Sequence, residues 1–455
     1  MKLKIISKWR TYRVLAVVVF VVLAGFLAAC VHDNGGSRPD PITGDELLTI
    51  TQEQTFKYFW DFGHPVSGMA REGEGTGHPD YTVTTGGTGF GLMAILVGVE
   101  RNFITRAEAV TRLTKIVDFL QTKATAYHGV YPHWMHGSTG TTIPFSPNDN
   151  GADLVESAFL FQGLLIVYEY FKTGTDPAET ALCAKIQTMW KAVEWDWFTR
   201  GGQNVLYWHW SPDKDWIMNH QLRGWNEVLI TYVLAASSPT HAISKTAYAG
   251  WGGSSIVTNN AYYGIQLPMG AQRGGPLFFT HYSFLGLDPH GLKDENVDYW
   301  KQVKNQAMIN YLYCVDNPLK YKGYGKNCWG LTASNTPSSV NNGYYASAPT
   351  ASDDKGIIAP TGALSSFPYT PDESMAALEH YYNDHGSRLW GKYGFYDAFR
   401  PDGTWYKTGY LAIDQGPIIV MIENYRTGLL WKLFMGNQDV KNGLSKLGFT
   451  ITPVK

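Results

Sequence analysis

The chain has 455 residues, with 37 Lys or Arg against 39 Asp or Glu, so its formal net charge at pH 7 is −2. A nearly neutral chain without a basic tract excludes a nucleic-acid-binding protein, because phosphate binding needs clustered Lys and Arg. The four Cys form no Cys/His cluster with zinc-ligand spacing. The aromatic content is unusual, with 16 Trp, 28 Tyr and 21 Phe beside only 17% charged residues.

The first 30 residues have the pattern of a bacterial lipoprotein signal peptide. A basic segment up to Arg13 precedes an apolar run from Val14 to Ala29, and Cys30 follows. Small residues directly before a Cys mark the cleavage site of a lipoprotein signal peptidase, and the run is short for a membrane span. We predict lipidation of Cys30 and an exported lipoprotein, in the outer membrane or periplasm of a Gram-negative bacterium. The membrane contact would be through the lipid anchor only, and an uncleaved anchor is the alternative.

The rest of the chain divides into a tether and one domain. Residues 31–43 are polar and rich in Gly and Pro, which is typical of a flexible linker. Residues 44–455 are long enough for more than one domain, but no linker, charge run or low-complexity segment interrupts them. We therefore predict a single domain over 44–455, and we expect a monomer.

Helical periodicity dominates that domain, and strand-like alternation is sparse. The segments 87–100 and 153–171 are apolar on most faces, as inner helices are, whereas 105–120 and 178–197 are amphipathic. Thr105 and Glu108 have the spacing of a capping box. In chain order, the predicted helices are 47–62, 87–100, 105–120, 153–171, 178–197, 225–236, 278–285, 294–313, 372–383, 415–434 and 440–447.

Alternation of buried and amphipathic helices predicts an all-α fold, namely an (α/α)6 toroid in which an outer ring of helices wraps an inner ring. The long aromatic loops would then gather at one end and form a cleft. A helical-repeat solenoid is the alternative, but the sequence has no repeat of fixed period.

Many aromatic rings lie in Gly-rich, polar segments where a core is not expected. Such rings suit stacking on the C–H faces of sugars, although each ring could instead pack back on the body. We interpret the set as a carbohydrate cleft, with His133, Trp134 and Trp405 as substrate-binding candidates. The aromatic loop segments are 131–134, 207–210, 321–329 and 405–406.

Three acidic residues precede an apolar helical segment. Asp149, Asp153 and Glu156 are spaced four and three residues apart, so they would share one face of a helix that begins by Asp149. The alternative is that Asp149 caps the helix and the others favour its dipole. Because this alternative leaves the third acid unexplained, we interpret the cluster as catalytic carboxylates of the kind that glycoside hydrolysis requires.

A further acid, Glu227, lies between a polar loop and the apolar segment 228–236. Partial desolvation there would raise the pKa of this carboxyl, as a general acid requires. A structural ion pair with Arg223 is the alternative. His220, Arg223 and Trp225, which precede Glu227, are additional substrate-binding candidates.

Asp414 is the last acidic candidate. With Pro417 in the following turn, it resembles a helix N-cap. A capping carboxylate stays ionised, which would suit a base better than an acid.

Together these segments resemble glycoside hydrolase family 144, the bacterial β-1,2-glucan hydrolases with a glucoamylase-like (α/α)6 domain, and in particular its sub-group from gut Bacteroidetes. The resemblance extends over about residues 49–446 and rests on the motifs TFKYFW (55–60), TGGTGFG (85–91), DNGADLVE (149–156), RGWNE (223–227) and IDQGP (413–417).

The resemblance implies an anomer-inverting hydrolase without metal or organic cofactor, acting on a β-glucan or gluco-oligosaccharide and releasing sophorose or short sophoro-oligosaccharides. The important carboxylates of the family would fall on Asp149, Asp153, Glu156, Glu227 and Asp414. Our preferred hypothesis makes Glu227 the acid. An acid of the Asp149/Asp153 pair would activate water, directly or through a substrate hydroxyl, because a helix dipole keeps acids at its N-terminus ionised.

Two other functions and two structural questions stay open at this point. A non-catalytic glycan-binding lipoprotein would explain the rings and the anchor but not the clustered carboxylates, and a polysaccharide lyase would use His, Arg or Tyr groups of the loops. Loops 321–329 and 341–355 are candidates for closing one end of the cleft, which would decide between internal and chain-end cleavage. Cys314 and Cys328 could form a disulfide or remain free thiols.

Overall fold

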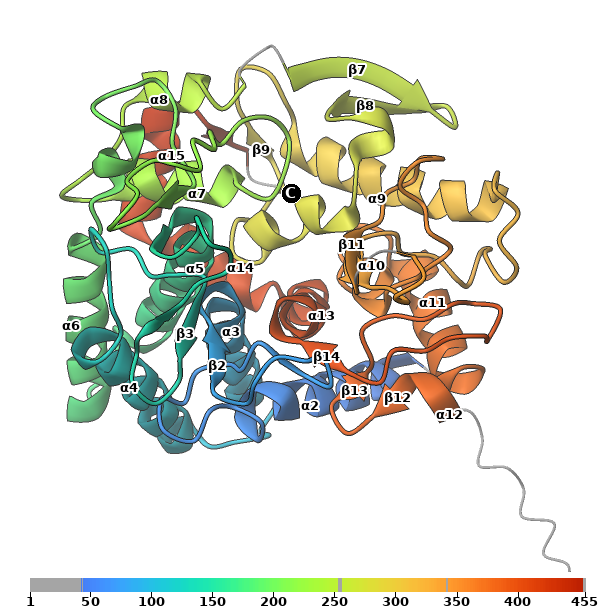
Figure 1. Cartoon of the computed structure of the whole chain (residues 1–455), viewed down its shortest axis with the longest axis horizontal. Helices are drawn as coiled ribbons and strands as arrows, with labels where there is room; N and C mark the ends of the chain where they lie inside the picture. Colours follow the sequence, from blue (N-terminus) through green and yellow to red (C-terminus); the bar gives the residue numbers. More distant parts are fainter. Residues whose placement is uncertain (1–41, 43, 253–255, 341–342, 453–455) are drawn as a thin grey trace, which may run out of the picture. The chain divides into compact units, whose positions relative to one another are not determined.

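A computed structural model describes residues 42, 44–252, 256–340 and 343–452. The predicted signal peptide, Cys30 and all of the predicted tether except Ile42 lie outside the described residues. Gly44–Lys455 form one compact unit. Its regular structure is mostly helical, with strands of two to six residues (Figure 1). The predicted all-α class is therefore confirmed in its coarse form.

Four apolar helices are buried over most of their length, namely α3 (Thr85–Glu100), α5 (Leu154–Phe171), α7 (Leu229–Ser237) and α13 (Ala412–Thr427). Helix α3 packs between α5 and α13, and α5 also contacts α7. Helix α5 is long and apolar enough to cross a membrane, but 83% of it is buried inside the protein, which identifies it as a core helix.

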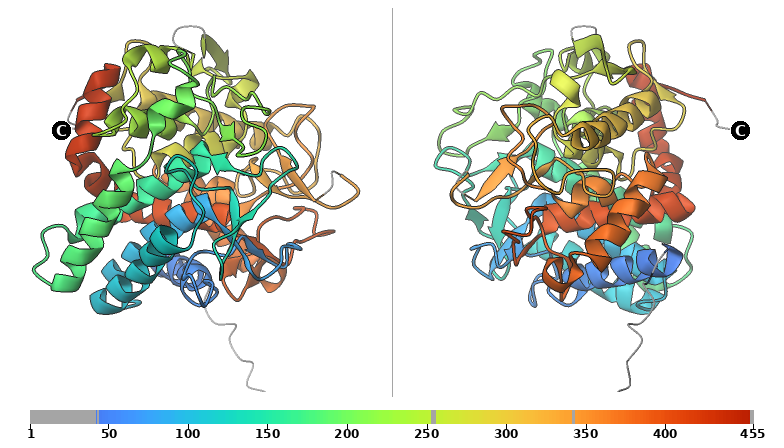
Figure 2. Two further views of the ribbon diagram at one scale, coloured as in Figure 1. Left: turned by 60° about the vertical axis from the view of Figure 1, so that its left-hand side comes forward. Right: turned by 90° about the vertical axis from the view of Figure 1, so that its right-hand side faces the viewer.

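The amphipathic helices pack around these four. Helices α4 and α6 lie side by side, as Figure 2 also shows, and α2 contacts both α3 and α13. The amphipathic helices are α2 (Gly44–Trp60), α4 (Arg106–Thr122), α6 (Pro177–Lys191), α9 (Tyr299–Asp316), α11 (Pro371–Asn383) and α15 (Gln438–Leu447). The shorter ones are α8 (Lys245–Ala249), α10 (Pro360–Leu364), α12 (Gly386–Leu389) and α14 (Leu429–Gly436).

The structure confirms the predicted capping box and corrects several predicted helix boundaries. The capping box is confirmed, since the Glu108 amide donates to the Thr105 hydroxyl and the Glu108 carboxylate accepts from the Thr105 amide. The single helix predicted for 415–434 is wrong, because Gly428 adopts φ 68° and separates α13 from α14. The segment 278–285 forms two short 3-10 helices, Leu277–Thr280 and Tyr282–Phe284.

Three buried helices follow a short strand without an intervening residue. Strand β2 (Thr82–Thr84) leads into α3, β5 (Ala152–Asp153) into α5 and β14 (Tyr410–Leu411) into α13. Each strand is held by antiparallel pairing: β2 with β3 (Trp134–His136), β5 with β6 (His209–Trp210), and β14 with β1 (Gly73–Glu74). The pairing fixes where each helix begins. The other strands are β4 (Thr142–Ile143), β7 (Val257–Tyr262), β8 (Ile265–Met269), β9 (Leu292–Lys293), β10 (Ala333–Asn335), β11 (Tyr344–Ala346), β12 (Trp390–Gly391), β13 (Gly394–Phe395) and β15 (Thr450–Ile451).

Glycines allow α3 to approach its two neighbours closely. A Cβ atom on Gly89 would lie 2.2 Å from the Phe159 carbonyl oxygen of α5, and one on Gly163 would lie 2.3 Å from the Gly89 carbonyl oxygen. In the first turn of α3, a Cβ on Gly87 would lie 2.5 Å from the Cβ of Ala412 in α13. Since no larger side chain fits at these positions, the N-terminal turns of the three helices meet.

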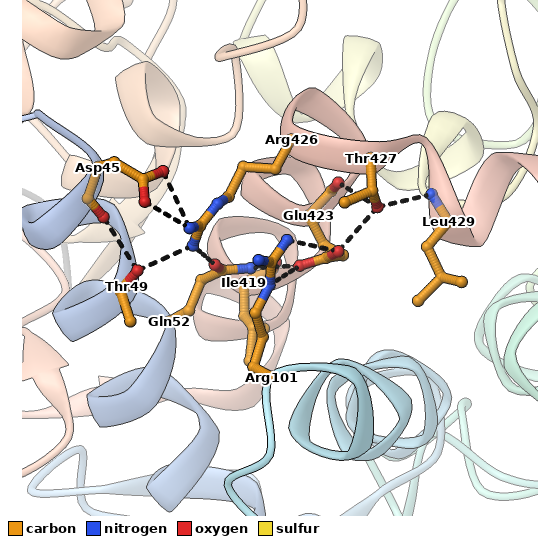
Figure 3. A network of polar contacts seen from close by, with 9 residues as sticks. All are labelled: Asp45, Thr49, Gln52, Arg101, Ile419, Glu423, Arg426, Thr427 and Leu429. Atoms are coloured by element: carbon orange, nitrogen blue, oxygen red, sulfur yellow. Dashed lines mark hydrogen bonds and ion pairs between the residues drawn. The ribbon is translucent and has the colours of Figure 1, made fainter.

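A charged network joins the opposite, C-terminal ends of α3 and α13 (Figure 3). Arg101 donates two hydrogen bonds of 2.7 and 2.8 Å to Glu423, whose side chain is only 1% exposed. Gln52 of α2 donates to the same carboxylate at 3.0 Å, and Arg426 donates to Gln52 and Asp45. Although burial opposes ionisation, the hydrogen bonds from Arg101, Thr427 and Gln52 lower the pKa of Glu423.

Cys183, Cys314 and Cys328 are buried, and all three are free thiols. Of the two alternatives for Cys314 and Cys328, the structure therefore has the unbonded one.

Replacing Gly89 by Ala tests the close contact of α3 with α5. We expect Gly89→Ala to lower the free energy of unfolding by roughly 1–3 kcal/mol, as overpacking of a core does, although Ala favours a helix over Gly by about 1 kcal/mol. Gly325→Ala is the control, because a Cβ there meets no atom within 4 Å. Denaturant titration measures both variants, and equal stability of the two would contradict the argument.

Candidate active site

A cavity of about 680 Å³ opens where the loops before α3, α5 and α13 meet. It combines two carboxylates with six aromatic side chains and several small polar groups. Its acidic and aromatic lining residues are Glu72, Glu156, Trp134, Phe145, Phe278, Tyr282, Tyr344 and Trp405, and His133, Asn335 and Lys407 also line it. The cavity therefore offers aromatic ring faces for stacking and carboxyl groups for proton transfer.

Glu156 lies in the first turn of α5 and is 6% exposed. Its Oε2 accepts a hydrogen bond of 2.8 Å from the Gly86 amide of α3. Burial raises the pKa of Glu156 to about 7, and the charges of Asp153 and Glu72 act in the same direction, against His133. The position at a helix N-terminus therefore does not keep this carboxyl fully ionised at neutral pH.

Asp153 is the N-cap of α5. Its Oδ1 accepts from the amides of Val155 and Glu156 at 3.1 and 2.9 Å and from the Trp208 indole at 2.8 Å. Its Oδ2 lies 3.1 Å from Nδ1 of His133. Burial alone would raise the pKa of Asp153, but the hydrogen bond from His133 and the nearby His209 lower it. Asp153 is thus the ionised member of the cluster.

His133 supplies the positive charge of the cluster. Burial alone would lower the pKa of this imidazole, but the carboxylates of Glu156 and Asp153 raise it to about 10. The side chain lines the cavity, so it presents a cation to a bound ligand.

Asp149 precedes β5 in a turn closed by Ser146, not in a helix. Its Oδ2 lies 3.3 Å from Nε2 of His209, which β6 brings opposite Asp153. Burial, followed by the charge of Asp153, raises the pKa of Asp149 to about 7. The predicted shared helix face is therefore wrong, as is the alternative of Asp149 as the cap, because α5 begins only at Leu154. The pairing of β5 with β6 places His209 beside both Asp149 and Asp153.

Glu227 lies one residue before the cap of α7 and is half-buried. The Ser283 hydroxyl donates 2.6 Å to its carbonyl oxygen and holds the backbone at this point. Burial raises the pKa of the Glu227 carboxyl to about 7, and the charge of Asp153 adds to the shift. The alternative ion pair with Arg223 is not formed among the described residues: Arg223 donates to Gln221 and to the Gly250 carbonyl.

Asp414 lies in the first turn of α13 and is only 1% exposed. The cap of α13 is Leu411, so the prediction of Asp414 as an N-cap is wrong. Burial and the adjacent Asp397 raise the pKa of Asp414 well above its usual range, which is opposite to the predicted ionised cap. Asp397 itself accepts from the amide and the side chain of Asn335 at 2.6 and 2.8 Å.

Tyr282 lies near several of these carboxyls. It lines the cavity, and its own pKa is raised well above the usual range by burial and then by the charges of Asp414, Tyr344, Glu227 and Glu156. Carboxyls from α5, α13 and the segment before α7 therefore lie close enough to Tyr282 to raise the pKa of its phenol.

The predicted substrate-binding residues divide into two groups. His133, Trp134 and Trp405 line the cavity. Trp225 is instead buried in the core, where its indole donates 2.7 Å to Gln306, and Arg223 is exposed. His220 is also exposed and stacks on Trp208 at 5.0 Å between ring centroids.

Sequence reasoning did not select four residues that the structure brings to the site: Glu72, Asp397, His209 and Tyr282. Glu72 reaches the cavity because β1 pairs with β14, and its carbonyl accepts from the Ala412 amide. Strands of two residues leave no periodicity in the sequence. The one available signal was the position of Glu72 in a short acidic, Gly-rich loop.

Among the residues that the structure describes, one group of side chains could hold a cation, since ligand atoms of Asp149, Asp153 and His209 lie within 4.8 Å of one another. The Oδ1 of Asp153, however, already accepts three N–H donors. This arrangement favours a hydrogen-bonded network at these residues.

Comparison with known proteins defines the class as glucoamylase-like. A family model described as "Putative glucoamylase" matches residues 219–438. The chain is 52% identical to the solved endo-β-1,2-glucanase from Chitinophaga pinensis, a complex with sophorotriose and glucose, with a TM-score of 0.87 over 90% of this chain and 99% of that one. An endo-β-1,2-glucanase from Talaromyces funiculosus, 12% identical, shares the fold with a TM-score of 0.65, covering 89% of each chain.

A further relative identifies the family of the chain more closely. The chain is 47% identical over 428 residues to the exo-β-1,2-glucooligosaccharide sophorohydrolase (non-reducing end) of Parabacteroides distasonis; the match covers 90% of this chain and spans 58% of that relative's length. The chain belongs to glycoside hydrolase family 144, as its motifs indicated.

The raised pKa of Glu227 predicts a specific pH dependence of stability. A carboxyl whose pKa is about 7 when folded and about 4.5 when unfolded binds its proton more tightly in the folded state. Its contribution to stability is thus full below about pH 4.5 and is lost as pH rises through 7. We expect the melting temperature of the wild type to fall more between pH 5 and 8 than that of Glu227→Gln. Glu46→Gln, at an exposed position of α2, is the control and should follow the wild type.

Proposed function

We propose that the protein hydrolyses β-1,2-glucan and releases sophorose or short sophoro-oligosaccharides with inversion at the anomeric carbon. The observation that carries the proposal is an aromatic-lined cavity whose wall contains Glu156 and Tyr282, with Glu227 and Asp414 of two other segments close enough to Tyr282 to raise its pKa. The activities named for the Chitinophaga and Parabacteroides relatives support the same substrate.

The corresponding architecture is a single (α/α)6 toroid over residues 44–455. The buried helices α3, α5, α7 and α13 would belong to the inner ring, and amphipathic helices such as α4 and α6 to the outer one. The direct entry of β2, β5 and β14 into three buried helices supports a cleft at the N-terminal end of that ring.

Glu227 is the proton donor in this proposal. Hydrolysis needs an acid that is still protonated near neutral pH when it meets the glycosidic oxygen. A carboxyl with a pKa of about 7 meets this condition, and the Glu227 side chain is only half-buried.

The base is assigned to the Asp149/Asp153 pair. Asp153 supplies the ionised carboxylate, and Asp149 lies beside it. A water molecule attacking the anomeric carbon would lose its proton towards this pair, directly or through a substrate hydroxyl. Since Oδ1 of Asp153 already accepts three N–H donors, Asp153 also holds His133 and the first turn of α5 in position.

Glu227→Gln tests the donor. We expect turnover of linear β-1,2-glucan to fall by roughly 10²–10⁴-fold, the usual contribution of a general acid, while sophorotriose binding measured by calorimetry persists. In the wild type, kcat/KM should decline above about pH 7, where Glu227 loses its proton. Near-normal turnover in the variant would remove Glu227 from the mechanism, and a run with EDTA checks the expected independence from metal.

Chromatography of the products decides the mode of cleavage. A disaccharide as the sole product would indicate chain-end action, whereas a ladder of oligosaccharides would indicate internal cleavage. Gly343, Tyr344 and Ala346 of the candidate blocking loop 341–355 line the cavity, so this loop can determine the outcome.

We further propose, from the sequence alone, that the mature protein is an exported lipoprotein of a Gram-negative bacterium, anchored through Cys30. Labelled palmitate should be incorporated into the wild type and not into Cys30→Ala; labelling of both would contradict the proposal.

A further inference from the structure

A second hollow, of about 830 Å³, lies outside the cleft. No residue that lines it also lines the cleft. We call it the aromatic shelf, and its lining residues are His128, Trp197, Arg200, Trp210, Lys214, Asp215, Trp216 and Ile217.

The rings of the shelf are held in fixed orientations. Trp197 stacks on His128 with 3.9 Å between centroids and 15° between planes, and it meets Trp210 edge-on at 6.4 Å. Trp216 is fixed from behind by Phe198 and Tyr207, at 5.9 and 5.7 Å. Trp197 nevertheless remains 41% exposed, so this large ring is presented to solvent without covering the core.

Polar groups border these rings. Arg200 is held by a 2.8 Å hydrogen bond to Asn219 and lies over the Tyr207 ring. Among the hydrogen bonds of the described chain, none uses the indole N–H of Trp197, Trp210 or Trp216. Flat apolar faces with hydrogen-bond donors at their edges match a pyranose, which has C–H groups on its faces and hydroxyls around its rim.

The shelf is structurally continuous with the acid cluster. In β6, His209 contacts Asp149, and the next residue, Trp210, borders the shelf. Successive residues of a strand point to opposite faces, so one strand serves both sites. The loops on either side are tied together, since Asn150 accepts from the Ser211 hydroxyl at 2.7 Å.

From this geometry we propose that the aromatic shelf is a non-catalytic binding site for a β-1,2-linked glucose segment of a polymer chain. The proposal rests on the proposed function for the linkage of the ligand. The shelf is lined by eight residues, whereas a stable protein interface takes about 20–30 residues a side, so an oligosaccharide fits its extent better than a second copy of the chain.

Affinity electrophoresis of the full chain tests the shelf. Wild-type protein should be retarded in gels that contain linear β-1,2-glucan. Trp197→Ala should weaken this retention about tenfold, which corresponds to about 1.4 kcal/mol, and Arg200→Ala should weaken it in the same direction. Tyr425→Ala is the matched control, since Tyr425 lies in α13, away from the shelf, and is 42% exposed; it should behave as the wild type.

Measurements of turnover distinguish a failure of the shelf proposal from a failure of the proposed catalytic function. If the wild type hydrolyses the polymer, Trp197→Ala should raise the apparent KM for long chains and leave kcat unchanged. If the gel retains Trp197→Ala and Arg200→Ala as strongly as Tyr425→Ala, the proposed glucan site on the shelf is overturned. The catalytic proposal is unaffected by that result. Absence of hydrolysis by the wild type would instead overturn the catalytic proposal. Self-association that is lost in Trp197→Ala, measured by sedimentation in the absence of glucan, would assign the shelf to a second copy of the chain.

Discussion

The backbones of α3 and α5 touch where Gly89 meets Phe159 and Gly163, and this close approach sets the distance between the first turns of the two helices. At that distance the Gly86 amide reaches the Glu156 carboxylate, and a side chain on Gly86 would collide with the same oxygen. The absence of a side chain therefore permits the helix contact at Gly89 and the hydrogen bond to Glu156 at Gly86.

The buried acids near the two ends of α13 have pKa values shifted in opposite directions. Near the C-terminus, Glu423 receives hydrogen bonds from Arg101 and Gln52, which lower the pKa of its carboxyl. Near the N-terminus, Asp414 faces another carboxyl, that of Asp397, and the pKa of Asp414 rises well above its usual range. A buried acid that is paired with a cation stays ionised, whereas acids gathered without enough positive charge are typical of sites that move protons.

Apolar periodicity was sufficient to find the core. The segments 87–100 and 153–171 were identified as inner helices because burial on all sides requires apolar residues throughout, and α3 and α5 follow them closely. Acids at the start of such segments were equally visible. The placement of His209 beside Asp149 and Asp153 was not, because β5 and β6 pair over only two residues and leave no pattern in the sequence.

Two other predictions failed because of contacts with distant segments of the chain. Asp414 has the sequence context of a cap, but the helix starts at Ala412, since β14 continues directly into it. Trp225 sits in a polar loop, yet the Gln306 side chain of α9 accepts its indole N–H inside the core. In both cases a residue from a distant segment decides the role of the side chain, and a single sequence does not contain that information.

The unbonded state of Cys314 and Cys328 affects how the protein can assemble. Burial raises the pKa of both thiols, so little thiolate forms at neutral pH and exchange with other disulfides is slow. Folding of residues 44–452 to this state forms no disulfide bond, so it needs neither an oxidant nor a disulfide isomerase. The domain should therefore reach its native state in a reducing cytoplasm.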